Sequence, residues 1–120
     1  VSDHAEERFI YSRDPGTMEP REPDWVVMPS SSEEVQKIMM LATERGVPLV
    51  PMGGGLVLSG LTRPLKGGIV LDMKRMNRIL EINEEDRYAL IEPGVRQVQL
   101  KPEVFKRGLT YPTASAGPSV

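Results

Sequence analysis

The chain is organised around one glycine-rich stretch, Pro51-Met52-Gly53-Gly54-Gly55-Leu56-Val57-Leu58-Ser59-Gly60. It lies between two apolar runs, residues 48–50 and 69–71. Three consecutive glycines have no side chains to bury, and they lose much conformational freedom when they become ordered. They do allow close approach to backbone N–H groups, and successive inward-facing N–H groups bind anions such as phosphate. The stretch therefore predicts a phosphate-binding loop to which Ser59 could add a hydroxyl donor, although a plain turn between strands also accounts for glycines alone.

Composition narrows the classes of function. The chain has 120 residues, of which 27% are charged and 39% hydrophobic, as expected for a globular domain. A net charge of −2 gives no electrostatic case for nucleic-acid binding, and no apolar run reaches membrane-spanning length. The absence of cysteine removes disulfides and thiolate sites, and charged residues interrupt any signal-peptide pattern near residue 1. We therefore expect a cytoplasmic protein without a membrane span.

The residues before the glycine stretch predict a βαβ unit. Residues 25–28 form a short apolar run that favours a buried strand. Ser31 and Glu34 fit a capping box at the start of a helix, and Gly46 is suited to end it. A second short strand follows at residues 49–50. Short connections of this kind predict parallel strands with a right-handed crossover.

The residues after the glycine stretch predict three more strands, at 69–72, 79–82 and 88–92, with one helical turn after the first. The last two strands should form a hairpin with an acidic tip. Residues 96–106 should be helical, with a kink or a new start at Pro102. Residues 1–23 show little periodicity and are expected to form an arm that lies across a larger body. The fold class is therefore α+β: a βαβ start with a small parallel sheet, plus antiparallel strands.

Several other kinds of chemistry are disfavoured. The glycine stretch lacks the Gly-Lys-Ser/Thr ending of a P-loop and the spacing of a dinucleotide fingerprint. The single histidine, His4, lies among charged residues near the N-terminus, where a solvated side chain is the simpler interpretation. No histidine cluster is present to hold a metal ion.

The order and spacing of several motifs resemble one family. The chain is similar to the FAD-binding domain of the vanillyl-alcohol oxidase and para-cresol methylhydroxylase (PCMH) superfamily, with the greatest resemblance to its glycolate oxidase, D-lactate dehydrogenase and 2-hydroxyglutarate dehydrogenase group. The motifs that carry the resemblance are Asp24-Trp25-Val26-Val27, Ser32-Glu33-Glu34-Val35, Val50 to Gly55 with Leu58-Ser59-Gly60, Gly68 to Met73, Met76 to Ile82, and Ile91-Glu92-Pro93-Gly94-Val95.

The resemblance implies a fold, a cofactor and a set of contacts. Residues 24–120 would be the N-terminal part of a PCMH-type FAD-binding domain that is incomplete here, with the substrate domain absent. FAD would be bound non-covalently by this segment, since members that attach FAD through this loop place a histidine in it, and residues 52–60 contain none. The implied cofactor-binding residues are Pro51, Met52, Gly53, Gly54, Gly55, Leu56, Val57, Ser59, Gly60, Pro112 and Ser115.

The resemblance also implies an activity. The segment would be the FAD-binding portion of a flavoprotein dehydrogenase that oxidises a 2-hydroxy acid, such as D-lactate or glycolate, or a related alcohol. Its expected partners are the remainder of the flavoprotein or a partner subunit, the small substrate, and an electron-acceptor protein. No catalytic residue can be nominated within the chain, so the segment alone should be inactive. The alternative is a non-catalytic flavin-binding or structural subunit of a larger redox assembly.

Two departures from the family pattern bear on these contacts. Leu56 and Val57 stand where the family usually has polar or small residues, so a side-chain contact to phosphate would be missing. After Tyr111-Pro112 the family commonly continues with Asp-Pro and then Gly-Gly-Asn, whereas this chain reads Thr113-Ala114-Ser115. The second flavin-contacting loop would therefore be altered.

Overall fold

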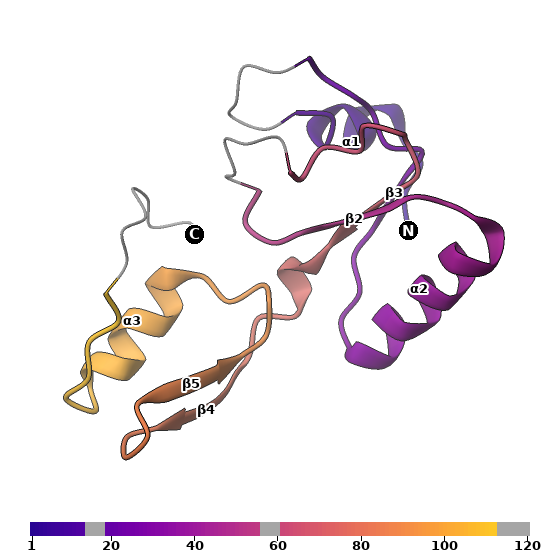
Figure 1. The fold of residues 1–120 in the computed structure, drawn as a ribbon. Coiled ribbons are helices and arrows are strands. Elements are labelled where there is room, and N and C mark those ends of the chain that lie inside the picture. Colours follow the sequence, from indigo (N-terminus) through magenta and orange to yellow (C-terminus); the bar gives the residue numbers. More distant parts are fainter. Residues whose placement is uncertain (14–18, 56–60, 113–120) are drawn as a thin grey trace.

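Two groups of elements, each with its own strands and helix, make up the structure (Figure 1). The computed structural model describes residues 1–13, 19–55 and 61–112. The elements are α1 (Ala5–Ile10), β1 (Trp25–Val27), α2 (Ser32–Arg45), β2 (Leu49–Met52), β3 (Ile69–Asp72), the 3₁₀ turn η1 (Met73–Arg75), β4 (Ile79–Asn83), β5 (Tyr88–Ile91) and α3 (Gln97–Phe105).

The first group, which we call the sheet body, is a three-stranded parallel sheet. Its strand order is β1-β3-β2, so β3 lies between the two strands of the predicted βαβ unit. Val70 at the centre of β3 pairs with Val26 on one side and with Val50 on the other. The predicted parallel arrangement is confirmed, and β3, which follows the glycine stretch, occupies the middle of the sheet.

Helix α2 packs beside this sheet and has the predicted ends. Ser31 Oγ accepts a hydrogen bond from the Glu34 N–H at 3.3 Å, while Glu34 Oε2 accepts one from the Ser30 N–H at 2.7 Å. The carboxylate therefore reaches one residue before the cap rather than the cap itself. Gly46 ends the helix with φ +62°, a left-handed conformation that glycine adopts without strain.

The N-terminal segment contacts the other side of the sheet body. Ser2 and Val26 exchange backbone hydrogen bonds of 2.8 and 2.9 Å, and α1 follows where the sequence showed little periodicity. Tyr11 packs in one buried cluster with Val26, Met52 and Val70. The segment thus contributes Tyr11 to the core of this body, while α1 itself has no buried residue, and the limit of the arm at residue 23 stays a prediction.

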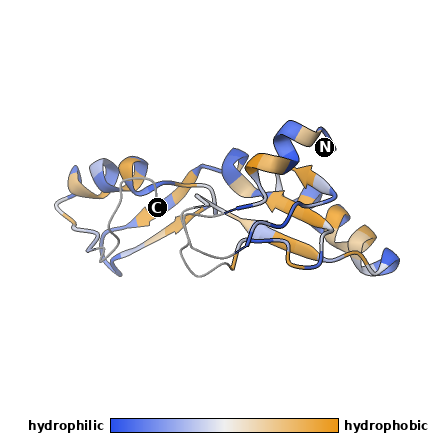
Figure 2. Ribbon diagram, turned by 90° about the horizontal axis from the view of Figure 1, so that it is seen from above, coloured by the Kyte–Doolittle hydropathy of each residue, from blue (hydrophilic) through white to orange (hydrophobic). Residues whose placement is uncertain are grey.

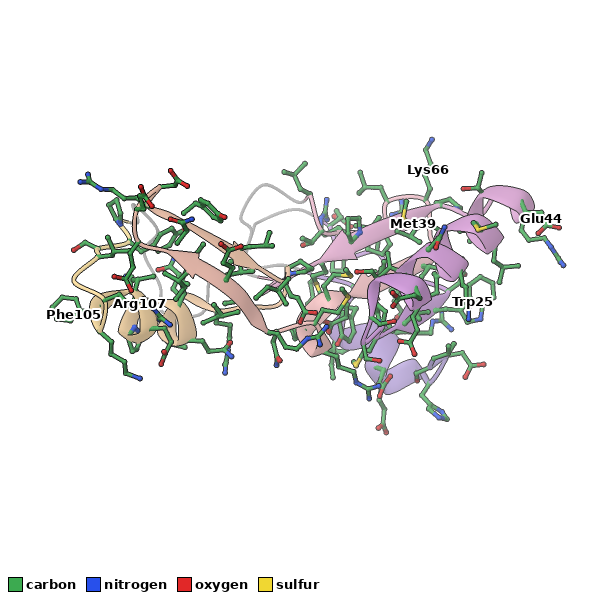
Figure 3. The ribbon with its side chains drawn as sticks, turned by 90° about the horizontal axis from the view of Figure 1, so that it is seen from below. Trp25, Met39, Glu44, Lys66, Phe105 and Arg107 are labelled. Atoms are coloured by element: carbon green, nitrogen blue, oxygen red, sulfur yellow. The ribbon has the colours of Figure 1, made fainter. Side chains whose placement is uncertain are left out.

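The second group, which we call the hairpin lobe, consists of the antiparallel pair β4-β5 and helix α3. Pro102 lies inside α3, and the helix nevertheless continues to Phe105. Arg107 follows α3 and forms an ion pair of 3.6 Å with Glu84 at the hairpin tip. Figure 3 shows Phe105 and Arg107 at one end of the molecule, with Trp25 and Met39 at the other.

The arrangement is elongated, with extents of 45 × 34 × 20 Å. The radius of gyration is 16.1 Å, whereas a compact domain of this length would have about 14 Å. None of the helices in the described ranges combines the length and the apolar character needed to cross a membrane.

Candidate functional site

The glycine triplet begins where the parallel sheet ends. Met52, the last residue of β2, pairs with Asp72, the last residue of β3. Gly53, Gly54 and Gly55 follow directly, so they leave the sheet at the carboxyl ends of its strands, where parallel sheets commonly bind ligands. Gly55 has φ +76°, which a residue with a side chain rarely adopts. The last position of the triplet therefore has a conformational requirement for glycine.

A second segment comes close to this triplet. A Cβ placed on Gly53 would lie 3.3 Å from the carbonyl oxygen of Pro93. Gly94 itself donates its N–H to the Met76 carbonyl at 2.8 Å, and a Cβ there would lie only 2.3 Å from the Met73 oxygen. The Pro93-Gly94 corner thus packs against both the glycine triplet and η1, and the approach requires glycine.

A cavity of about 520 Å³ opens between these segments. It has two cationic side chains, Lys74 and Arg96, and the backbone at Gly54 and Gly94 contributes to its wall. Such a wall is suited to an anion, because positive charge and exposed backbone stabilise phosphate oxygens. The residues that line it are Gly54, Lys74, Asn77, Pro93, Gly94, Val95, Arg96 and Gln99.

A buried carboxylate lies behind this cavity. The side chain of Asp72 is 0% exposed, and its Oδ2 accepts a hydrogen bond from the Tyr11 hydroxyl at 2.6 Å. The Lys74 ammonium lies 3.2 Å from the same oxygen, and the Lys74 backbone N–H donates to Oδ1 at 2.9 Å. Burial and the neighbouring Asp72 carboxylate raise the pKa of Tyr11 above its usual range. Tyr11 therefore keeps its proton and remains a donor to Asp72.

The predicted cofactor-binding residues are placed as follows. Gly54 lines the 520 Å³ cavity, and Gly53 and Gly55 flank it in the chain. The side chain of Met52 packs in the core, while Pro51 is exposed and lines a groove beside α2. Pro112 is exposed beyond α3. The remaining predicted contacts lie outside the described residues: Leu56, Val57, Ser59, Gly60 and Ser115.

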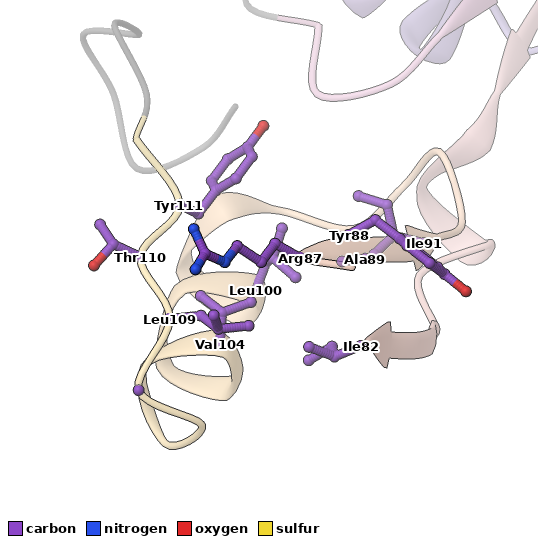
Figure 4. A pocket seen from close by; sticks show the side chains of 11 residues that line it. Ile82, Arg87, Tyr88, Ala89, Ile91, Leu100, Val104, Leu109, Thr110 and Tyr111 are labelled. Carbon is purple, nitrogen blue, oxygen red and sulfur yellow. The ribbon is translucent and has the colours of Figure 1, made fainter. Parts of the chain in front are cut away.

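The residues leading to Pro112 border a different cavity, of about 550 Å³, between the hairpin and α3 (Figure 4). Thr110 and Tyr111 line one part of it, and Leu100 and Val104 of α3 line another. Arg87, which has φ +57°, contributes from the turn between β4 and β5. The structure thus places Gly54 and the segment that precedes Pro112 at separate hollows.

Sequence reasoning did not select Lys74, Asn77, Arg96 or Gln99 as site residues. A signal is present in the Pro93-Gly94-Val95 motif, because its glycine marks a close approach. Pairing that corner with the glycine triplet would have pointed to the neighbouring Arg96. Within the described residues, no group of three or more His, Cys, Asp or Glu side chains is arranged to hold a metal ion.

Comparison with known proteins identifies the family. The family model described as "FAD binding domain" matches residues 23–120. The chain is 41% identical over 105 residues to glycolate oxidase subunit GlcD of Bacillus subtilis, a match that covers 88% of this chain and 22% of that protein. It is 43% identical over 99 residues to D-2-hydroxyglutarate dehydrogenase of Stutzerimonas stutzeri, covering 81% of this chain and 21% of that protein.

A solved structure agrees with this assignment. The structure of p-cresol methylhydroxylase with substrate bound matches 98% of this chain and 24% of its own, with a TM-score of 0.79 and 26% identity. The predicted fold, a small parallel sheet plus antiparallel strands of the PCMH type, is confirmed. The chain spans about a fifth of the length of the curated relatives named above. It belongs to the FAD-binding domain family of flavin-dependent oxidoreductases, and its cofactor is FAD.

Proposed function

We propose that the cavity beside Gly54 receives the pyrophosphate of FAD, and that the chain is the FAD-binding portion of a dehydrogenase that oxidises a 2-hydroxy acid. The observation that supports this most directly is the meeting of Gly54 with Lys74 and Arg96 in one cavity. Backbone at the glycine triplet can approach phosphate closely because no side chain intervenes. The two cations can offset the negative charge of a diphosphate.

The residues of this chain would bind and orient the cofactor. FAD, when bound, supplies the two-electron chemistry of substrate oxidation. An acid–base group within hydrogen-bond reach of the substrate is also required, and the only histidine, His4, is exposed near the N-terminus and outside both cavities. In this proposal that group belongs to sequence outside residues 1–120, in the same protein or in a partner subunit.

The names of the two relatives described above support the substrate class, since glycolate and 2-hydroxyglutarate are both 2-hydroxy acids. The first of these relatives is described as a subunit, which keeps the alternative of a flavin-carrying, non-catalytic subunit within a redox assembly. Flavin absorbance distinguishes the two. The native protein that carries this chain should be yellow, and glycolate, D-lactate or D-2-hydroxyglutarate should bleach it anaerobically. Stable colour with all three acids would favour the non-catalytic subunit.

The position of the pyrophosphate is tested by Gly54→Val in the native protein. A branched side chain at Gly54 would occupy part of the cavity, so bound flavin should fall at least tenfold while the melting temperature of the apoprotein changes little. Gly46→Ala at the end of α2 is the control, because Gly46 has no neighbour within 4 Å and lies away from the cavity. Full flavin occupancy in Gly54→Val would contradict the proposal.

The mode of attachment can be measured on the same protein. Because residues 52–60 contain no histidine, we expect acid denaturation to release any flavin that this loop contacts. A peptide covering these residues that carries a flavin in mass spectrometry would show covalent attachment instead.

A further inference from the structure

Lys74 has an environment that its sequence position alone does not reveal. It lies in η1, just after β3, and lines the same cavity as Gly54. Its side chain is 53% exposed, so the ammonium is accessible to a ligand. The ammonium also lies 5.4 Å from the centre of the Tyr11 ring, a distance at which the ring face attracts a cation.

The buried carboxylate of Asp72 holds the Lys74 ammonium in place. Asp72 is fully buried, is held by the Tyr11 hydroxyl, and contacts both the backbone and the ammonium of Lys74. A lysine ammonium has three N–H donors, and within the described part of the chain Asp72 is the partner recorded for it. Donors therefore remain for oxygen atoms that enter the cavity.

We propose that Lys74 is a phosphate-binding residue of this site, and that Asp72 and Tyr11 are positioning residues that hold its ammonium beside the glycine triplet. The proposal rests on the proposed function, since it assigns the FAD pyrophosphate to this cavity. The simpler alternative is that Lys74 only neutralises Asp72. A buried carboxylate does need a counter-charge, so the two roles have to be separated by experiment.

The first measurement is the dissociation constant of FAD for the native protein and its Lys74→Met variant. Methionine keeps the length of the side chain and removes the charge. Loss of a hydrogen bond to a charged group typically lowers affinity by about tenfold or more. We therefore expect FAD to bind to Lys74→Met about tenfold more weakly. Lys74→Arg should restore most of the affinity. Lys101→Met on α3 is the matched control, since Lys101 is an exposed lysine that lines neither cavity, and it should bind FAD normally.

The second measurement removes both members of the ion pair. In Lys74→Met/Asp72→Asn, the buried carboxylate no longer needs a counter-charge. A purely neutralising lysine predicts that FAD affinity returns to normal in the double variant, which would overturn the proposal. A phosphate-binding lysine predicts that the tenfold loss persists. Unchanged affinity in Lys74→Met would also overturn the proposal, whereas failure of the unaltered protein to bind FAD would overturn the proposed function itself.

Discussion

The sheet body and the hairpin lobe contain similar elements but bury them to different extents. Val70 and Leu71 in the central strand of the sheet body are 0% and 2% exposed, whereas Leu80 and Leu90 in the hairpin are 53% and 52% exposed. The sheet has the N-terminal segment on one side and α2 on the other (Figure 2). The hairpin faces α3 across the cavity of about 550 Å³ described above. Two strands rarely close a core without a further layer. The sheet body therefore buries its central strand, whereas the hairpin lobe buries Leu100 and Val104 of α3 and leaves leucines of its strands exposed within the described residues.

The two regions are joined at a corner that also forms the candidate site. Arg78 donates two side-chain hydrogen bonds to Glu92 Oε1, at 2.7 and 3.0 Å, and its backbone N–H donates to Oε2 at 2.7 Å. Just beyond, Gly94 bonds back to Met76. This corner fixes where Pro93 and Arg96 lie relative to the glycine triplet. The site thus depends on the relative placement of the two regions.

The largest expected effect compares a buried leucine of the sheet body with an exposed leucine of the hairpin. Leu71→Ala removes a buried side chain from the sheet body and should lower the free energy of unfolding by about 3 kcal/mol. Leu80→Ala removes the same atoms from an exposed position in the hairpin and should cost less than about 1 kcal/mol. Urea denaturation of the purified protein measures both. Equal losses would show that the hairpin lobe is packed as tightly as the sheet body.

A smaller effect concerns the corner and depends on pH. The hydrogen bonds from Arg78 lower the pKa of Glu92 below its ordinary value. A carboxyl whose pKa is lower in the folded state stabilises the fold above the unfolded pKa, about 4.3, and loses that contribution as the pH falls through the folded value. Glu92→Gln should therefore be less stable than the unaltered protein at pH 7, and the difference should shrink below about pH 4.

The melting temperatures of Glu92→Gln and the unaltered protein between pH 3 and pH 7 provide the measurement. Glu103→Gln is the control, because Glu103 pairs with Lys106 on the exposed surface of α3, where such pairs contribute little. A difference between Glu92→Gln and the unaltered protein that is independent of pH would contradict the assigned cause.

The sheet body was largely predictable because its signals are local. Ser31, Gly46 and the short apolar runs determine where α2 and the flanking strands begin and end, and the structure agrees within a few residues. The insertion of β3 between β1 and β2 was not predictable in this way, since strand order depends on contacts between distant residues. Helix α1 was missed because six residues are too few to show a periodic pattern.

The candidate site was predicted only in part, and for a related reason. Gly54 was selected because a glycine triplet allows close approach to backbone N–H groups, and the structure places it in a cavity. Lys74 and Arg96 reach the same cavity through η1 and through the corner at Gly94, which no spacing rule joins to residue 54. The buried Asp72 was not marked either, because its burial depends on Tyr11 from the N-terminal segment.

The smallest expected effect tests whether the two regions unfold together. Gly46 ends α2 and Gly108 follows α3, with φ of +62° and +70°, and neither has an atom within 4 Å of the position of an added Cβ. Alanine at either residue should therefore cost about 1 kcal/mol of folding free energy through its backbone alone.

Because the hairpin lobe buries little, we expect the cost of Gly108→Ala to stay local. Hydrogen–deuterium exchange should accelerate in α3 for Gly108→Ala and leave the central strand β3 unchanged, whereas Gly46→Ala should accelerate exchange in α2 and in the sheet beside it. If Gly108→Ala accelerates exchange equally throughout, the corner at Arg78 and Glu92 couples the two regions into one cooperative unit, and the difference in burial between them does not translate into a difference in stability.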